Sequence, residues 1–147
     1  MDAEAEELAM RVLSIATQVV DRIQEALARR GYVDVRPAHG FAFVRISAGN
    51  ATTLDVAEHL GVTKQAASQL VEQLVARGYV ERPVDPDDAR RRPLRLTPRG
   101  RACTRAAQAG AAEAVKPWAD QLSPDGLRRL LGALRRIDTG GPLRPAW

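Results

Sequence analysis

The sequence is poor in the residues that build covalent cross-links and metal sites. Its 147 residues include one cysteine, Cys103, and two histidines, His39 and His59. A single cysteine excludes an intrachain disulfide, and a structural zinc ion would need carboxylate ligands as well. We therefore expect neither a bound metal nor any other cofactor.

Signatures of catalysis are also missing. The sequence shows no paired nucleophile and base, no glycine-rich phosphate loop and no cluster with metal-ligand spacing. Two histidines offer little general acid–base chemistry. The expectation is a protein that is not an enzyme and has no catalytic residue.

Long apolar runs and positively charged targeting signals are absent too. No stretch approaches the roughly 18 apolar residues of a membrane-spanning helix. The N-terminal residues Asp2, Glu4, Glu6 and Glu7 are acidic where a secretory signal would be basic and then apolar. We expect a cytoplasmic chain that does not bind membranes.

Basic charge is present, and it is concentrated in one part of the chain. The formal net charge is +4. Between Arg77 and Arg105 there are nine arginines and four acidic residues, whereas residues 1–30 hold six acidic residues and four arginines. This asymmetry predicts a polyanionic partner for one part of the molecule only.

Apolar periodicity predicts a mainly helical fold. Helices are expected over residues 3–30, 38–47, 53–60, 63–76, 97–116 and 123–138. Two short strands, 79–84 and 92–96, flank the polar, turn-rich segment 85–91, which predicts a projecting two-stranded ribbon. Helix 3–30 has few partners in its own chain, so a second subunit is a natural cover for its apolar stripe.

Local signals mark the ends of several helices. Thr53 and Thr63 are expected N-caps, and Ser123 opens the last helix. Gly100 and Gly110 should each weaken helix 97–116 by about 1 kcal/mol relative to alanine.

Residues 53–72 carry the pattern of a helix-turn-helix. Gly61 stands between two short helices, at a turn whose backbone conformation favours glycine. Ala57 lies where the helices should cross, and its small side chain allows close approach. The apolar residues expected to join the two helices are Val56, Leu60, Val62, Ala67 and Leu70.

The polar face of helix 63–76 is a candidate DNA contact. Gln65 and Gln69 point away from the apolar face, and Ser68 and Gln73 flank them. Glutamine can bond an adenine edge bidentately. Thr63 and Lys64, at the amino end of the helix, suit a phosphate. The alternative is that these residues form an ordinary solvated face.

The tip of the ribbon is a second candidate contact. An arginine at the end of a thin ribbon can enter the minor groove, where the negative potential is focused. Arg90 follows Asp87 and Asp88, either of which could orient its guanidinium; the alternative is a flexible charged loop. The DNA-binding residues predicted in all are Thr63, Lys64, Gln65, Ser68, Gln69, Gln73, Asp88, Arg90, Arg91 and Arg92.

Four runs of sequence, residues 60–71, 74–82, 85–90 and 94–100, closely resemble the MarR family (multiple antibiotic resistance regulators). The most specific is Asp88-Ala89-Arg90 before a strand that ends in Leu96-Thr97. The resemblance implies that Asp88 and Arg90 are the wing pair whose arginine enters the minor groove. Pro93 departs from the family pattern, which has an ordinary strand former there.

The resemblance covers nearly the whole chain and implies its organisation. Residues 1–147 would form a single MarR-like domain, mainly α with a two-stranded β wing. A winged helix-turn-helix, 37–98, and a connecting helix, 97–116, would be flanked by N- and C-terminal dimerisation helices, 1–36 and 117–147. The implied function is a homodimeric transcriptional repressor that reads double-stranded DNA at a pseudo-palindromic operator, with half-sites about one helical turn apart.

The resemblance also implies release from DNA by a small aromatic or phenolic ligand. The nearest ligand-binding candidates are His39, Phe41, Phe43 and Arg45. A phenylalanine pair is more often core than pocket, and His39 could be a helix cap or an exposed residue instead. Oxidation sensing in the family generally uses a cysteine near the N-terminus, so we expect Cys103 to be a buried small residue.

A winged-helix module that binds another protein, without an operator, is the alternative function. The basic wing and the polar helix face of this chain argue against that alternative. A steep fall of DNA affinity with salt would separate the two, because phosphate contacts release counterions.

Overall fold

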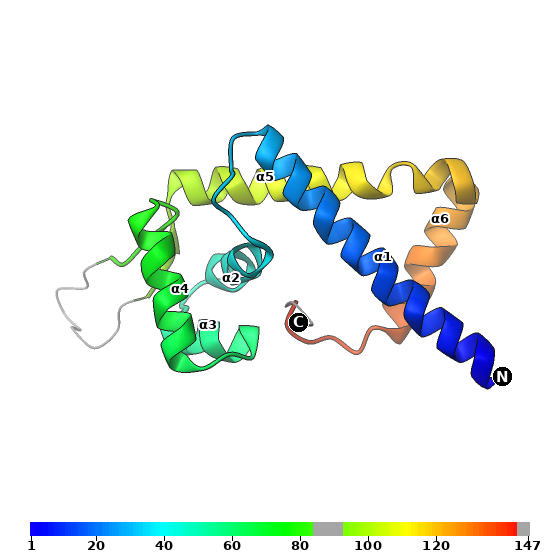
Figure 1. Cartoon of the computed structure of the whole chain (residues 1–147), viewed down its shortest axis with the longest axis horizontal. Coiled ribbons are helices and arrows are strands. Elements are labelled where there is room, and N and C mark those ends of the chain that lie inside the picture. The colour runs from blue at the N-terminus through cyan, green and yellow to red at the C-terminus, as the bar shows by residue number, and fades with distance from the viewer. Residues whose placement is uncertain (84–92, 144–147) are drawn as a thin grey trace. The chain divides into compact units, whose positions relative to one another are not determined.

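The computed structural model describes residues 1–83 and 93–143, and this part of the chain is mainly helical (Figure 1). The elements are α1 (Asp2–Arg29), α2 (Pro37–Ser47), α3 (Thr53–Leu60), α4 (Lys64–Ala76), β1 (Val80–Glu81), β2 (Arg95–Leu96), α5 (Pro98–Val115) and α6 (Trp118–Ile137). The predicted fold class, a mainly α chain with a two-stranded ribbon between α4 and α5, is confirmed.

The chain divides into two compact units. Unit 1 comprises Met1–Val33 and Ala106–Thr139, and unit 2 comprises Asp34–Arg105 and Gly140–Trp147. The chain thus enters unit 2 between α1 and α2 and leaves it within α5. From the sequence, the winged helix-turn-helix was expected over residues 37–98, with a connecting helix over 97–116. In unit 2 the tail reaches α3, since the His59 ring lies 3.1 Å from the carbonyl oxygen of Leu143.

The start of α3 corrects one expectation. Thr52, not Thr53, is the N-cap, and its hydroxyl accepts a hydrogen bond from the backbone N–H of Asp55 at 3.2 Å. The Asp55 carboxylate in turn accepts the Thr52 N–H at 2.7 Å. This reciprocal capping box needs an acidic or amide side chain three residues after the cap, which only Thr52 has. Thr63 caps α4 as predicted, accepting from the Ala66 N–H at 3.1 Å.

The last helix begins earlier than expected and has a kink. α6 starts at Trp118, and Ser123 interrupts it with φ 61° and ψ 162°. The Ser123 hydroxyl accepts from the Gly126 N–H at 3.2 Å, so the predicted start at Ser123 is the start of the second part of α6. Pro124 follows, at a position where its missing N–H costs nothing.

The ribbon is shorter than the sequence indicated. β1 and β2 pair antiparallel, with Val80 opposite Leu96 and Glu81 opposite Arg95. Pro83 and Pro93 stand just beyond the paired residues, and neither has an N–H to extend the ladder. Leu94 instead donates its N–H to the carbonyl oxygen of Ala51 at 2.7 Å, which anchors the base of the ribbon to the segment before α3.

Unit 1 leaves a large apolar surface open. The first 18 residues of the chain are exposed, and no residue of α6 is buried. Leu8 is 65% exposed, and Leu131 and Leu134 on α6 are 47% and 42% exposed. Hydrophobic side chains at helical spacing are normally covered. None of the described helices combines the length and apolarity that crossing a membrane requires.

Candidate nucleic-acid interface

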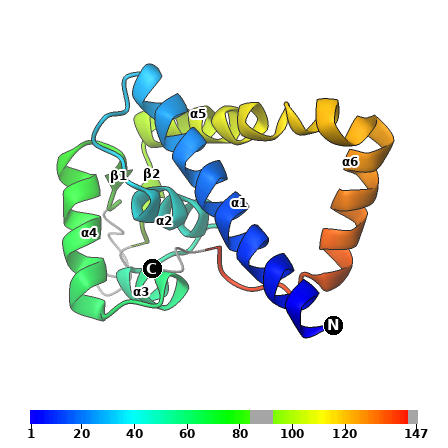
Figure 2. The ribbon, with the colours of Figure 1, turned by 45° about the vertical axis from the view of Figure 1, so that its right-hand side comes forward.

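Helices α3 and α4 form the helix-turn-helix that the sequence predicted. α3 buries Val56, Ala57 and Leu60, and α4 buries Ala67, Val71 and Leu74. Gly61, at φ 68° and ψ 34°, makes the turn in the left-handed region. Figure 2 shows the two helices meeting at this turn beside α2. One detail was wrong: Val62 is 43% exposed and does not help to join the helices.

The predicted recognition residues share the outer side of α4. Thr63, Lys64, Gln65, Gln69 and Gln73 are exposed, and Ser68 is half-buried. The three glutamines stand four residues apart, so they form a line about 12 Å long on one side of the helix. The buried residues of α4 lie on the opposite side and fix this orientation. The spacing suits contact with several neighbouring base pairs.

The base of the ribbon is held by Thr97. Its N–H donates to the carbonyl oxygen of Tyr79 at 3.0 Å, and its hydroxyl donates to the carbonyl oxygen of Gly78. The same hydroxyl accepts from the Gly100 N–H at 3.1 Å, which caps α5. Thr97 therefore joins the end of α4, the ribbon and the start of α5 through its backbone N–H and its hydroxyl.

The contacts predicted at the ribbon tip, Asp88, Arg90, Arg91 and Arg92, lie outside the described residues. Exposed basic side chains at the base are described, however: Arg82, Arg95, Arg99 and Arg101. Arg95 lies 3.9 Å from Glu81 across the ribbon, and Arg101 donates to the carbonyl oxygen of Leu96 at 2.8 Å. The side of unit 2 that carries the ribbon is thus rich in arginine.

A cluster around Asp34 was not predicted from the sequence. The Tyr79 hydroxyl donates to the Asp34 carboxylate at 2.6 Å, and Arg99 donates to the Tyr79 oxygen at 3.0 Å. Arg77 donates to the backbone carbonyl oxygen of Asp34, also at 2.6 Å. Asp34 and Tyr79 are 45 residues apart, and no local pattern relates them.

The ionisation of the two central groups follows from these contacts. The hydrogen bond from Tyr79, aided by the charges of Arg99 and Arg77, lowers the pKa of Asp34. Burial, followed by the bond to Asp34, raises the pKa of Tyr79. Near neutral pH the carboxylate is therefore ionised and the phenol keeps its proton, which is the pairing that the hydrogen bond requires.

His39 is buried at the first turn of α2 and is only 1% exposed. Its Nδ1 accepts the backbone N–H of Arg36 at 2.9 Å, which caps the helix. Its side chain also bonds Gln73 of α4. Burial and the charges of Arg36 and Arg77 lower the pKa of His39. The ring is therefore neutral near neutral pH and ties α2 to α4.

Two of the other predicted ligand-binding residues, Phe43 and Arg45, have structural partners. Phe43 is 1% exposed, and its ring lies 5.7 Å from that of Tyr79, tilted by 42°. Phe41 is half-buried. Arg45 donates to the carbonyl oxygen of Gly49 at 3.1 Å and lies 3.8 Å from Asp55. The ligand site at these residues stays a prediction.

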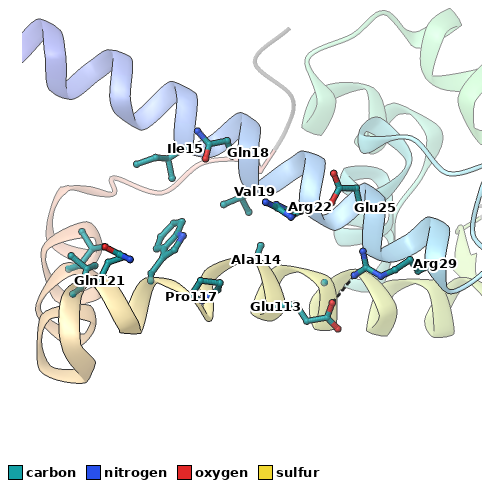
Figure 3. Close-up of a pocket in the computed structure, with 14 residues that line it drawn as sticks. Ile15, Gln18, Val19, Arg22, Glu25, Arg29, Glu113, Ala114, Pro117 and Gln121 are labelled. Carbon is teal, nitrogen blue, oxygen red and sulfur yellow. Dashed lines mark hydrogen bonds and ion pairs between the residues drawn. The ribbon is translucent and has the colours of Figure 1, made fainter.

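A cavity of about 620 Å³ lies in unit 1, where the sequence predicted none (Figure 3). Its apolar wall includes Ile15, Val19, Pro117, Trp118 and Leu122. Gln18 and Gln121 add polar groups. The volume is in the range of small-molecule sites, and the residues come from α1, α5 and α6.

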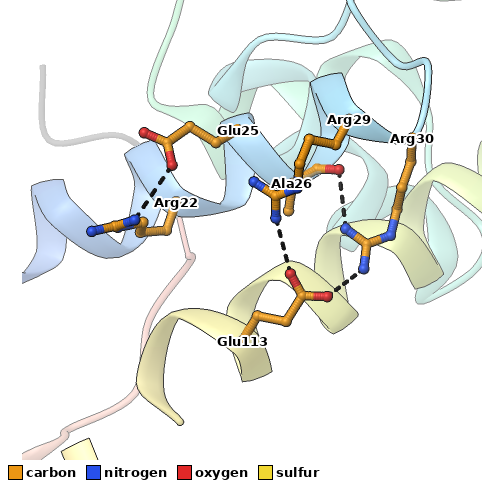
Figure 4. A network of polar contacts seen from close by, with 6 residues as sticks. All are labelled: Arg22, Glu25, Ala26, Arg29, Arg30 and Glu113. Carbon is orange, nitrogen blue, oxygen red and sulfur yellow. Dashed lines mark hydrogen bonds and ion pairs between the residues drawn. The ribbon is translucent and has the colours of Figure 1, made fainter. Parts of the chain in front are cut away.

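The charged residues at this cavity are paired with one another. Glu113 of α5 accepts from both Arg29, at 3.1 Å, and Arg30 of α1 (Figure 4). Arg22 lies 3.7 Å from Glu25 on the same helix. The bond from Arg30 lowers the pKa of Glu113, with Arg29 adding to the effect. The wall therefore offers no excess of either charge.

Cys103 is a buried thiol, as expected. It is 1% exposed, and burial, with a smaller contribution from Asp34, raises its pKa to about 11. Arg99, rather than the neighbouring Arg101 or Arg105, is the cation that opposes this shift. Within the described residues, no group of three or more histidine, cysteine or acidic side chains could hold a metal ion.

Comparison with known proteins points to one family. The MarR family model matches residues 41–91, the segment from α2 to the ribbon. No curated protein matches the sequence significantly. The family resemblance inferred from the sequence is confirmed by this match, which includes the runs 60–71, 74–82 and 85–90.

Solved structures extend the likeness to the rest of the chain. Apo MarR from Escherichia coli has a TM-score of 0.71 and 22% identity, over 89% of this chain and 96% of that one. An E. coli MarR mutant complexed with operator DNA has a TM-score of 0.67 and 22% identity, over 92% and 96%. The Mycobacterium tuberculosis MarR family protein Rv2887, in complex with salicylic acid, has a TM-score of 0.69 and 22% identity, over 88% and 95%. These values establish the fold.

Proposed function

We propose that this chain is a MarR-family transcription regulator that binds double-stranded DNA sequence-specifically as a homodimer and represses its target genes. The observation that carries the proposal is the exposed line of glutamines on α4. The apolar residues of the helix-turn-helix are packed beneath it, and an arginine-rich ribbon follows it directly. Regulation of this kind needs no catalytic residue, and the DNA partner agrees with the expected cytoplasmic location.

Each part of the interface has a proposed role. Gln65 and Gln69 read base edges in the major groove, and Ser68 and Gln73 border them. Thr63 and Lys64 meet a phosphate at the helix N-terminus, where the backbone N–H groups and the helix dipole favour an anion. Arg90, oriented by Asp88, enters the minor groove, and Arg91 and Arg92 add phosphate contacts.

The homodimer is proposed from unit 1. The exposed leucines of α1 and α6 need a cover, and a second copy of unit 1 offers the same apolar surface. Two-fold symmetry would present two copies of α4 to a pseudo-palindromic operator. The proposed dimerisation segments are residues 1–36 and 117–147, most of which belong to unit 1.

Release by a small aromatic or phenolic ligand is part of the proposal. A structurally similar M. tuberculosis protein is in complex with salicylic acid. In this chain, two places are candidates: the residues His39, Phe41, Phe43 and Arg45, and the cavity of unit 1. Salicylate added to a DNA complex, followed by substitution of Trp118 or Phe41 with alanine, would show which of the two matters.

Footprinting on the DNA upstream of the protein's own gene tests the proposal. We expect two protected half-sites about one helical turn apart. Gln69→Ala should lose discrimination at one base pair in each half-site, by about 5- to 150-fold for a bidentate contact of 1–3 kcal/mol. Gln108→Ala, an exposed glutamine on α5, is the matched control and should bind like the wild type.

Two results would argue for the alternative of a protein-interaction module. One is a footprint that shows no protected site, even at protein concentrations high enough to saturate non-specific DNA. The other is DNA affinity that does not change with salt, because phosphate contacts always release counterions.

A further inference from the structure

Asp34 lies between α1 and α2, outside every surface assigned to DNA, yet it contacts the supports of both DNA-binding elements. Its carboxylate accepts from Tyr79, which lies between α4 and β1. Its second carboxylate oxygen lies 3.8 Å from Arg99, at the start of α5 just after the ribbon. Its backbone carbonyl accepts from Arg77, the C-cap residue that follows α4.

Tyr79 links Asp34 to the surrounding elements because it is fully buried where the ribbon, α2 and the start of α5 meet. Its carbonyl oxygen accepts from Thr97 across the base of the ribbon, and its ring packs on Phe43 of α2. The backbone at Gly100 lies so close that an added Cβ would collide with the Tyr79 carbonyl oxygen. A shift of the Tyr79 ring would therefore move the ribbon, α2 and the start of α5 together.

Arg99 covers the Tyr79 ring on its outer side. Its guanidinium lies 4.5 Å from the centroid of the Tyr79 ring, and its side chain passes over Gly78, which terminates α4 at φ 79°. It also donates to the phenolic oxygen that bonds Asp34. The hydrogen bonds made by ionised groups are the stronger kind, so the cluster is a rigid support.

We propose that Asp34 is a positioning residue for DNA binding, which fixes the end of the recognition helix and the base of the wing in one arrangement. The inference rests on the proposed function, because it assumes that α4 and the wing engage DNA together. It adds a residue that touches neither groove.

The sign of the effect of Asp34→Ala on DNA affinity tests the inference. Removing an acidic side chain ordinarily strengthens binding to a polyanion. A positioning role predicts the opposite, a loss of about tenfold on the duplex protected in footprinting, in line with the energy of a hydrogen bond to a charged group. Asp34→Asn keeps an acceptor for the Tyr79 hydroxyl and should recover part of the loss.

Glu81→Ala is the matched control. Glu81 is an exposed acidic residue of the ribbon itself, paired at 3.9 Å with Arg95 and outside the cluster. Its removal should leave affinity unchanged or raise it. If Asp34→Ala behaves like Glu81→Ala, Asp34 acts through charge alone and the inference is wrong.

Tyr79→Phe supplies a second test without a change of charge. It keeps the buried ring and removes the hydroxyl that reaches Asp34. Its loss of affinity should overlap with that of Arg90→Ala, so that the double variant loses less than the product of the two separate losses. Fully multiplicative losses would contradict a shared arrangement.

Thermal unfolding of each variant distinguishes a loss of DNA affinity from a loss of folding. Variants that melt near the wild type and bind more weakly support the inference, and variants that melt near the wild type and bind equally well overturn it. If Asp34→Ala does not fold, Asp34→Asn and Tyr79→Phe carry the comparison. Absence of salt-dependent DNA binding by the wild type would overturn the proposed function itself, which separates that failure from the failure of Asp34.

Discussion

His39 joins the N-terminus of α2 to the recognition helix through one imidazole ring. Its Nδ1 accepts the Arg36 N–H, so in the neutral ring the proton resides on Nε2. That leaves Nε2–H as the ring's donor, and a side-chain hydrogen bond joins the ring to Gln73. His39, which the sequence suggested for ligand binding, therefore contacts Gln73, which it suggested for DNA binding.

We predict that His39 makes the stability of the protein depend on pH. Its folded pKa is below the ordinary 6.5, first because of burial and then because of Arg36 and Arg77, although the bond to Gln73 and the charge of Asp34 oppose them. As pH falls below about 6.5, the unfolded chain takes up a proton that the folded chain resists, so the free energy of unfolding falls until the folded pKa is reached. Above about 6.5 the contribution is constant.

Denaturant titrations at several pH values check this prediction. His39→Asn can still accept the Arg36 N–H, because its side-chain oxygen occupies the place of Nδ1, but it does not titrate. Wild type should lose more stability than His39→Asn between roughly pH 7 and pH 5, where an ordinary histidine gains its proton. Equal pH dependence of the two proteins would show that His39 does not resist protonation.

Cys103 should be inert to mild oxidants. Its pKa of about 11 leaves almost no thiolate at neutral pH, and the thiolate is the reactive form. We expect peroxide treatment to leave the DNA affinity of wild type and Cys103→Ser equally unchanged. A peroxide-induced loss of binding in the wild type alone would assign Cys103 a redox role. Band-shift titrations before and after treatment provide the measurement.

At the scale of elements, two glycines of α5 show packing that overrides helix propensity. A Cβ at Gly110 would lie 2.7 Å from the Cβ of Ala26, and one at Gly100 would meet the Tyr79 carbonyl oxygen. The sequence identified both only as weak points in a helix. Each is instead a place where another part of the chain approaches the α5 backbone. The cost in helix propensity is offset by the close approach that a bare backbone allows.

Gly110→Ala is therefore expected to destabilise the protein although alanine is the better helix former. We predict a loss of about 1–3 kcal/mol, the usual cost of overpacking a tight contact. Gly132→Ala in α6 is the control, since its new Cβ would meet only the flexible end of Arg136 at 3.8 Å. The control should gain about 0.5–1 kcal/mol from propensity. Thermal or denaturant unfolding measures both, and a gain at Gly110 would refute the close contact.

Features with local causes were predictable, and those with distant causes were not. Gly61 and Thr63 could be assigned because a turn and a cap depend on neighbouring residues. The expected cap at Thr53 was wrong because both threonines can cap a helix, and only Thr52 has the Asp55 carboxylate three residues later. The contacts Asp34–Tyr79 and Ala26–Gly110 join residues far apart in sequence, and a single sequence holds no sign of them. The polar side of α4 was predictable because its buried residues fix its orientation.

At the scale of the whole molecule, the surfaces of the two units differ in kind. Unit 2 presents polar and basic side chains around α4 and the ribbon. Unit 1 presents apolar side chains along α1 and α6, together with a cavity whose charges are internally neutralised. The first surface fits a polyanion and the second fits another apolar surface. This division is what a DNA-binding dimer requires.

Weakening the apolar surface of α6 should dissociate the dimer. Leu134 is 42% exposed, and burying a leucine fully is worth about 1.5–3 kcal/mol. Because symmetry doubles the change, Leu134→Gln should raise the dimer dissociation constant at least about tenfold. Arg129→Gln, also exposed on α6, should have little effect. Sedimentation over a range of concentrations measures both, and an unchanged dimer in Leu134→Gln would exclude this surface.

The central claim is that unit 2 binds DNA through α4 and the wing. Its most direct test is the equilibrium affinity for the footprinted duplex, measured by fluorescence anisotropy at several salt concentrations. We predict a steep linear fall of log affinity with log salt, about 0.9 per phosphate contact. Arg90→Ala should bind more weakly and reduce that slope by about one. An affinity that ignores salt, or an Arg90→Ala titration that superimposes on the wild type at every salt concentration, would contradict the account.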